Sequence, residues 1–151
     1  MFNGNNLLVQ GIDQENSGLT ENFWELIPIE KFDLKKINEK ENGQSIFTDA
    51  EEKATLAIQK HSMNIMGEER NPIMDKAYLL LGKSRYYDGR YIPSLEAFNY
   101  ILYKYPKSEL INEVKIWKEK INVKLNQNEF AHTNLRDLLE QNNLSNPDKY
   151  N

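Results

Sequence analysis

The stretch from Asp75 to Pro106, DKAYLLLGKSRYYDGRYIPSLEAFNYILYKYP, constrains the fold of this chain more than any other part of it. Its apolar residues recur at helical spacing. Asp88-Gly89 breaks the first helix, and Pro106 ends the second. Gly82 lies in the middle of the first helix, where the absence of a side chain lets a neighbouring helix approach closely. We therefore expect two short helices, joined at a glycine turn and packed against each other.

With Asp75 as its first residue, this stretch resembles a tetratricopeptide repeat, a helical hairpin of roughly 34 residues. The repeat-packing positions that carry the resemblance are Tyr78, Leu81, Gly82, Gly89, Tyr91, Phe98 and Pro106. Ser94 and Ile101 depart from the family pattern, which has a small alanine at both positions; serine preserves the close crossing, whereas isoleucine widens it. The resemblance implies a hairpin that is stable only when it is stacked on neighbouring hairpins.

Helical patterns flank this repeat on the N-terminal side. We expect a long helix to begin at FTDAEEKA, with Thr48 or Asp49 as the N-cap and a glutamate three residues later completing a capping box. Apolar and small residues follow at helical spacing as far as Ile65 and Met66, and Gly67 ends the helix before Pro72. This helix is the second half of an upstream repeat whose first half is not recognisable in the sequence.

A third, degenerate hairpin is predicted after Lys107. Val114, Trp117, Ile121 and Leu125 mark the apolar face of its first helix. A second set of apolar residues indicates the return helix, namely Phe130, Ala131, Leu135, Leu138 and Leu139.

The N-terminal part, residues 1–47, is the least regular. NNLLVQGIDQ fits a short amphipathic helix, and an apolar cluster from Phe23 to Phe32 surrounds Pro28. We expect this segment to cross the repeat helices as a strap and to bury Trp24; the alternative is a hook that binds a partner. The predicted fold is thus all-α and consists of tetratricopeptide-like helical hairpin repeats (an α-solenoid). The chain divides into the strap 1–47, a repeat domain 48–142 and a polar tail 143–151. The repeat domain holds a half repeat 48–72, the best-formed repeat 75–106 and a degenerate repeat 107–142.

The composition bears on several classes of function. The chain has no cysteine, which excludes disulfides and thiolate chemistry, and its net charge is −4. No basic cluster is interleaved with exposed aromatic residues, so nucleic acid is not an expected partner. His61 and His132 have no companion at metal-ligand spacing, and we expect His61 to be a packing residue. No phosphate-binding glycine loop and no nucleophile elbow is present. We predict no catalytic site, no cofactor and no metal.

A binding surface is then the expected function. First helices line the concave face of a repeat stack, and the residues of the central repeat assigned to that face are Lys76, Leu79, Lys83, Tyr86 and Tyr87. Seven tyrosines fall between Tyr78 and Tyr105, more than the packing positions require. Tyrosine and lysine together suit an acidic or extended peptide. Packing of the tyrosines against a further repeat is the alternative.

A longer resemblance covers nearly the whole chain. The run KHSMNIMGEERNPIMDKAYLLLGKSRYYDGRYIPSLEAFNYILYKYPKS, preceded by FTDAEEKATLAI, is similar to the SprE/PorW family. FNGN and NFWELIPIEKF are similar to the segment that precedes the repeats in that family. The family consists of tetratricopeptide-repeat lipoproteins of the type IX secretion and gliding-motility machinery of Bacteroidota.

This resemblance implies a non-enzymatic scaffold on the periplasmic side of the outer membrane, which connects the translocon to ring and motor components. Family members are longer and begin with a lipoprotein signal, so we expect this chain to be an N-terminal fragment that starts after the lipidation site. Membrane association is then expected only through the lipid anchor of the intact protein. The alternative is a generic tetratricopeptide adaptor that binds short peptide tails of client proteins. The identity of the partner and the oligomeric state are left open.

Overall fold

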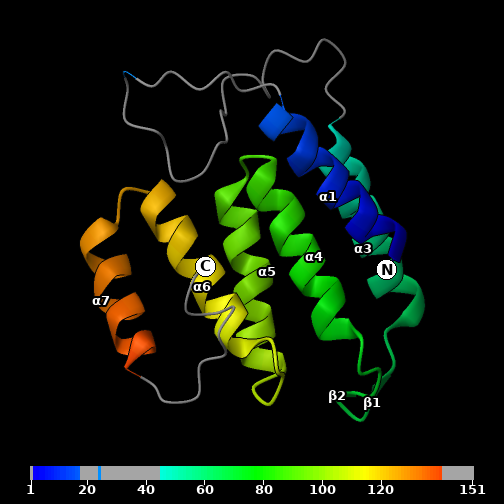
Figure 1. The fold of residues 1–151 in the computed structure, drawn as a ribbon. Coiled ribbons are helices and arrows are strands. Elements are labelled where there is room, and N and C mark those ends of the chain that lie inside the picture. The colour runs from blue at the N-terminus through cyan, green and yellow to red at the C-terminus, as the bar shows by residue number, and fades with distance from the viewer. Residues whose placement is uncertain (1, 18–23, 25–44, 141–151) are drawn as a thin grey trace.

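The computed structural model describes residues 2–17, 24 and 45–140 (Figure 1). These ranges hold six helices and one small β-hairpin. The helices are α1 (Phe2–Ser17), α3 (Ile46–His61), α4 (Met74–Tyr87), α5 (Tyr91–Lys104), α6 (Ile111–Lys124) and α7 (Asn128–Leu139), and the strands are β1 (Asn64–Ile65) and β2 (Glu68–Glu69). The prediction of an all-α fold is confirmed for this part of the chain.

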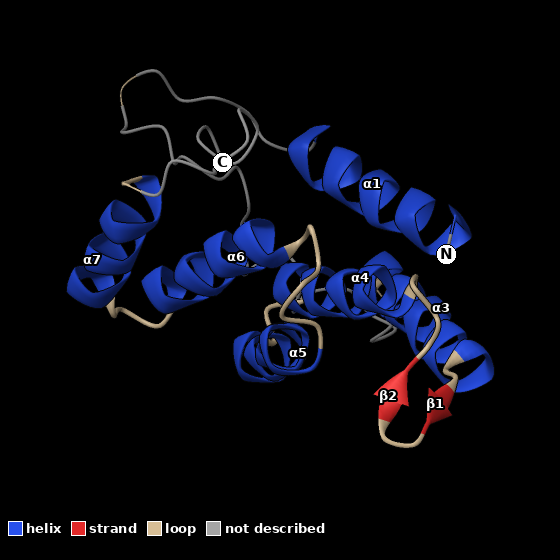
Figure 2. Cartoon of the chain, turned by 90° about the horizontal axis from the view of Figure 1, so that it is seen from below, coloured by secondary structure: helices blue, strands red, loops and turns tan. Residues whose placement is uncertain are grey.

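The helices pack in sequential antiparallel pairs: α1 with α3, α4 with α5, and α6 with α7. Each pair also contacts the next one, through α3 with α4 and α5 with α6. Between the first helices of the pairs, α1 contacts α4 and α4 contacts α6. Figure 2 shows α1 and α5 on opposite sides of α4. The arrangement is consistent with a stack of helical hairpins, in which α1 supplies the first helix of the upstream pair that the sequence analysis left incomplete.

Two glycines let α1 lie close against its neighbours. A Cβ atom at Gly4 would stand 2.7 Å from Cδ2 of Leu80, and one at Gly11 would stand 2.5 Å from Cγ2 of Ile46. Leu8 is buried between these two positions. Residues 4, 8 and 11 share one face of the helix, so this face packs closely on α3 and α4.

The central hairpin follows the prediction closely, with α4 and α5 separated by a turn at Gly89, whose φ is 76°. A Cβ atom at Gly82 would stand 2.5 Å from Cε1 of Phe98, a side chain that is completely buried. The Ser94 hydroxyl donates to the Gly82 carbonyl at 2.7 Å, which fixes the same helix crossing. Gly82 therefore lies at a close crossing of α4 and α5. Of the other repeat-packing positions, Leu81 is buried, Tyr78 and Tyr91 are half-buried, and Pro106 is exposed just beyond α5.

The start of α3 differs from the expectation. The N-cap is Ser45, three residues before Thr48. Its hydroxyl accepts from the Thr48 amide at 3.2 Å, and the Thr48 hydroxyl accepts from the Ser45 amide at 3.1 Å, so the capping box is closed by a hydroxyl and not by a glutamate. The earlier start places Phe47 in the first turn, where its side chain is fully buried.

The end of α3 is the largest departure from the sequence prediction. The helix ends at His61, and the chain then forms the hairpin of β1 and β2, with Met66 and Gly67 at its turn. The Glu69 carboxylate accepts from the Ser62 hydroxyl at 2.5 Å and from the Met63 amide at 2.7 Å. These bonds are side-chain contacts that helical periodicity does not reveal, so extension of the helix to Met66 is wrong.

The third hairpin is formed by α6 and α7, but the residue at its helix crossing differs from the one in the central pair of α4 and α5. At the ninth position of the first helix, α4 has Gly82 and α6 has Glu119. Glu119 is buried and accepts from the amide side chains of Asn122 at 2.7 Å and Asn134 at 3.0 Å. A carboxylate thus fills the space that a ring occupies in the central pair. The predicted return helix is present as α7, in which Ala131 and Leu138 are buried whereas Phe130 and Leu139 are exposed.

The predicted strap, residues 1–47, lies only partly within the described residues. Its first part is helix α1, which packs as described above. Trp24 is 96% exposed, which contradicts its expected burial. Residues 18–23 and 25–44, and the predicted tail 143–151, lie outside the described residues.

Candidate functional site

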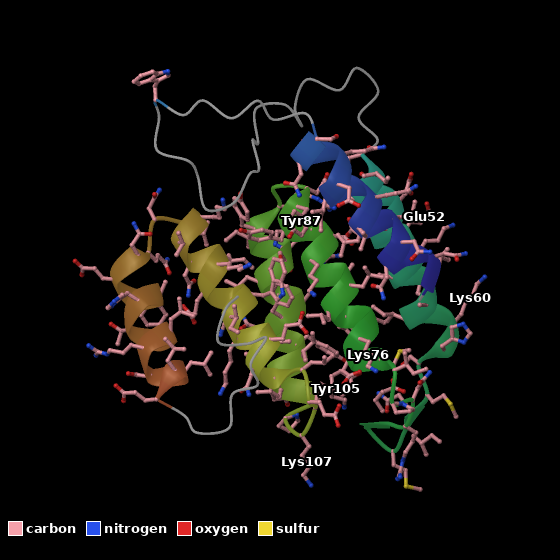
Figure 3. All side chains as sticks on the ribbon, viewed as in Figure 1. Glu52, Lys60, Lys76, Tyr87, Tyr105 and Lys107 are labelled. Carbon is pink, nitrogen blue, oxygen red and sulfur yellow. The ribbon has the colours of Figure 1, made fainter. Side chains whose placement is uncertain are left out.

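The candidate site is the face of α4 that points away from α5, together with the neighbouring part of α6. Of the five residues predicted there, Lys76 is exposed at the start of α4, and Lys83 and Tyr87 are half-buried. Leu79 is only 8% exposed, and Tyr86 is completely buried. Figure 3 shows Lys76 and Tyr87 towards opposite ends of α4.

Leu79 and Tyr86 belong to the core because α6 covers them. They share one hydrophobic cluster with Phe98 and Ile101 of α5 and with the apolar residues of α6, namely Val114, Trp117 and Ile121. Their assignment to an exposed binding surface is therefore corrected. Packing of α6 on α4 is a contact between different repeats, which the sequence of the central repeat alone does not specify.

The tyrosines at the end of α4 pack around Trp117. Tyr86 and Tyr87 both meet the indole edge-on, with ring centroids at 5.2 and 5.8 Å. Tyr87 also stacks on Phe47 at 5.5 Å. These rings join α3, α4 and α6, so Tyr86 and Tyr87 tie all three hairpins together.

A second tyrosine cluster lies at the other end of the central pair. Tyr78 contacts Tyr100 at 4.4 Å and Tyr105 at 6.3 Å between ring centroids. Burial, with a smaller contribution from a hydrogen bond with Tyr100, raises the pKa of Tyr78 to about 12. Burial also raises the pKa of Tyr105 well above its ordinary value. Of the seven tyrosines in this region, Tyr103 is the one that stands almost fully in solvent.

Two lysines converge on Trp117 from successive repeats. Lys83 and Lys120 are each the tenth residue of their helix, α4 and α6. Their Nζ atoms lie 5.2 and 4.6 Å from the indole centroid, within the range of a cation–π interaction. Lys83 also forms an ion pair of 2.5 Å with Glu113. Glu113 thus compensates the charge of Lys83, and Lys76 is the exposed lysine of α4 on this face.

An ion-pair network, missed by the sequence analysis, stiffens the turn beside this face. Glu51 on α3 accepts from the Arg85 Nε atom at 2.8 Å and also pairs with Arg90. Partial burial alone would raise the pKa of Glu51, but the bonds from Arg90 and Arg85 outweigh it and lower that pKa. Asp88 in turn accepts from Arg90 at 2.7 Å and from the Ser45 hydroxyl at 2.8 Å. Glu51 therefore links the first helical pair to Arg85 of α4 in the next pair.

The described residues contain no group of three or more histidine, aspartate or glutamate side chains that could hold a metal ion. His61 is exposed because α3 ends there, so its predicted packing role is wrong. His132 is exposed on α7.

Two shallow cavities lie away from this face. One, of about 270 Å³, lies between the base of the β-hairpin and the loop after α5. The other, of about 350 Å³, lies between the start of α1 and the end of α3 and is lined by Lys53, Lys60 and His61 among others. Among the described helices, none is long and apolar enough to cross a membrane.

Models of known protein families give no match to this sequence, and the curated proteins give none either.

Proposed function

We propose that this chain is a non-enzymatic scaffold that binds other proteins through the first helices of tetratricopeptide-like repeats. The observation that carries the proposal is the contact of α1 with α4 and of α4 with α6, because it sets three first helices side by side. Extended binding surfaces in repeat proteins are made by such stacking.

The partner surface that this face favours is acidic. Lys76 is exposed at the start of α4 and supplies positive charge, whereas the charge of Lys83 over Trp117 is compensated by Glu113. Electrostatic complementarity of this kind acts mainly on the association rate and on the choice of partner. Tyr87 adds half-buried ring surface beside Trp117.

We further propose that the scaffold acts in type IX secretion and gliding motility, in the periplasm and at the outer membrane through the anchor of the intact protein. This assignment rests on the resemblance of the sequence to the SprE/PorW family, and the stacked hairpins agree with the repeats of that family. Its role would be to connect the outer-membrane translocon with periplasmic ring or motor components.

A capture experiment tests both statements. The chain is immobilised and exposed to solubilised envelope of a bacterium that has type IX secretion. We expect translocon or ring proteins to be retained, and Lys76→Glu to reduce their retention. Lys60→Glu is the matched control, because Lys60 is an exposed lysine on α3, a second helix. Retention that is equal for all three chains would remove the first-helix face as the binding surface.

The second candidate is a generic adaptor for short peptide tails, which the same basic face would also suit. The kind of ligand that is bound distinguishes the scaffold from the adaptor. An array of short acidic peptides that gives sequence-dependent binding, together with capture of no secretion component, would favour the adaptor. The opposite pair of results would favour the scaffold.

A further inference from the structure

Lys83 lies where α4 meets α6, and a carboxylate of the chain itself is already bound to its ammonium group. The Nζ atom of Lys83 forms an ion pair of 2.5 Å with Oε1 of Glu113. The same Nζ atom lies 5.2 Å from the centroid of the Trp117 indole. Glu113 and Trp117 are four residues apart, so they share the face of α6 that is turned towards Lys83. This position on the first helices therefore accepts a carboxylate beside an aromatic ring.

The ion pair is within reach of a ligand. The side chain of Lys83 is 23% exposed and that of Glu113 is 30% exposed, so a carboxylate from outside can approach the ammonium group. A partly exposed ion pair is weak, because water and salt screen it and two long side chains lose freedom. The contact between α4 and α6 rests instead on the hydrophobic cluster that contains Leu79, Val114 and Ile121. A ligand can therefore replace Glu113 without separating the two helices.

A second lysine on the same face of α4 has no such internal partner. Lys76 is exposed and takes part in none of the ion pairs among the described residues. It lies seven residues before Lys83, which is two helical turns or about 10 Å along the axis. An extended peptide covers that distance in about three residues. A segment with several carboxylates can therefore meet Lys76 and Lys83 together, whereas a single carboxylate meets Lys76 at no cost.

We propose that Glu113 is an internal competitor for the carboxylates of an acidic partner, and that the bound partner replaces Glu113 on Lys83. The inference rests on the proposed function, since it takes the first helices as the binding face. Breaking the ion pair lowers the affinity of every acidic ligand that uses Lys83. A segment with clustered acidic residues recovers this loss through its contact with Lys76. Glu113 therefore makes the face selective for clusters of acidic residues.

Binding of fluorescein-labelled hexaglutamate to the full chain, measured by fluorescence anisotropy, tests the competition. We expect Glu113→Gln to tighten binding about fivefold, because a partly exposed ion pair opposes its competitor by about that factor. Glu109→Gln is the matched control, since Glu109 is exposed in the loop before α6 and its removal changes the net charge equally. In a chain that also carries Lys83→Met, the gain from Glu113→Gln should disappear. Circular dichroism checks that each variant stays helical.

The outcomes separate this inference from the proposed function. If the parent chain binds hexaglutamate but Glu113→Gln binds it no more tightly than Glu109→Gln does, the competition is overturned and the acidic partner stands. An equal gain from Glu113→Gln with and without Lys83→Met also overturns the competition, because the effect is then general repulsion. If no variant prefers hexaglutamate to hexaglutamine, the acidic partner and the competition are both overturned.

Discussion

The Gly82→Ala substitution measures how closely the central helices approach. The new Cβ atom would stand 2.5, 2.7 and 2.9 Å from three ring atoms of Phe98. Atoms do not approach so closely without movement, and the Phe98 ring is completely buried, so its neighbours prevent it from turning aside. Overpacking of this kind costs about 1–3 kcal/mol, and three short contacts on one ring place the cost near the upper end. Alanine in a helix interior returns about 1 kcal/mol relative to glycine.

The net loss is therefore about 2 kcal/mol, or roughly 4–8 °C in Tm for a chain of this size. Urea unfolding followed by circular dichroism at the helix band measures it. The double variant Gly82→Ala with Phe98→Leu serves as the control, since a smaller side chain removes part of the overlap and the two effects become non-additive. If Gly82→Ala were as stable as the parent chain or more stable, the close helix crossing would be wrong.

Three further predictions concern polar groups. Ser45→Ala removes the N-cap of α3 and should lower the free energy of unfolding by about 1 kcal/mol. Asp49→Ala, at the position where the cap was expected, should lower the free energy of unfolding by less. Equal losses in urea melts would contradict Ser45 as the cap. Glu51 has a lowered pKa in the folded state, so its stabilising contribution is present above its ordinary pKa of 4.5 and is lost as the pH falls through the lowered value. Glu51→Gln should therefore flatten the acid unfolding curve in that pH window. An unchanged curve would count against the network of Glu51 with Arg85 and Arg90. Tyr78 has its pKa raised from 10.0 to about 12, so its stabilising contribution is complete below pH 10 and is lost as the pH rises towards 12. Tyr78→Phe should therefore reduce alkaline destabilisation, and an unchanged alkaline unfolding curve would contradict this.

The sequence was sufficient where the determining contacts are local. The spacing of Gly82, Gly89 and Phe98 predicted the central hairpin because the two helices contact each other within one repeat. The cap of α3 was misplaced because Ser45 and Thr48 can both cap a helix, and the choice depends on the burial of Phe47 against other helices.

Other features depended on contacts between distant segments. Leu79 and Tyr86 match the usual spacing of a concave face, but α6 lies over them. The hairpin at Met66 was missed because Ile65 and Met66 fit a helical period, and the bonds made by the Glu69 side chain decide against it. Arg85 of α4 forms an ion pair with Glu51 of α3.

Binding through the first helices is tested most directly in a bound state. Hydrogen–deuterium exchange of the chain with and without a captured partner reports protection helix by helix. We expect new protection in the amides of α4 and α6 near Lys76, Lys83 and Lys120, with little change in α3 and α5. Protection confined to α3, α5 or α7 would contradict binding through the first helices.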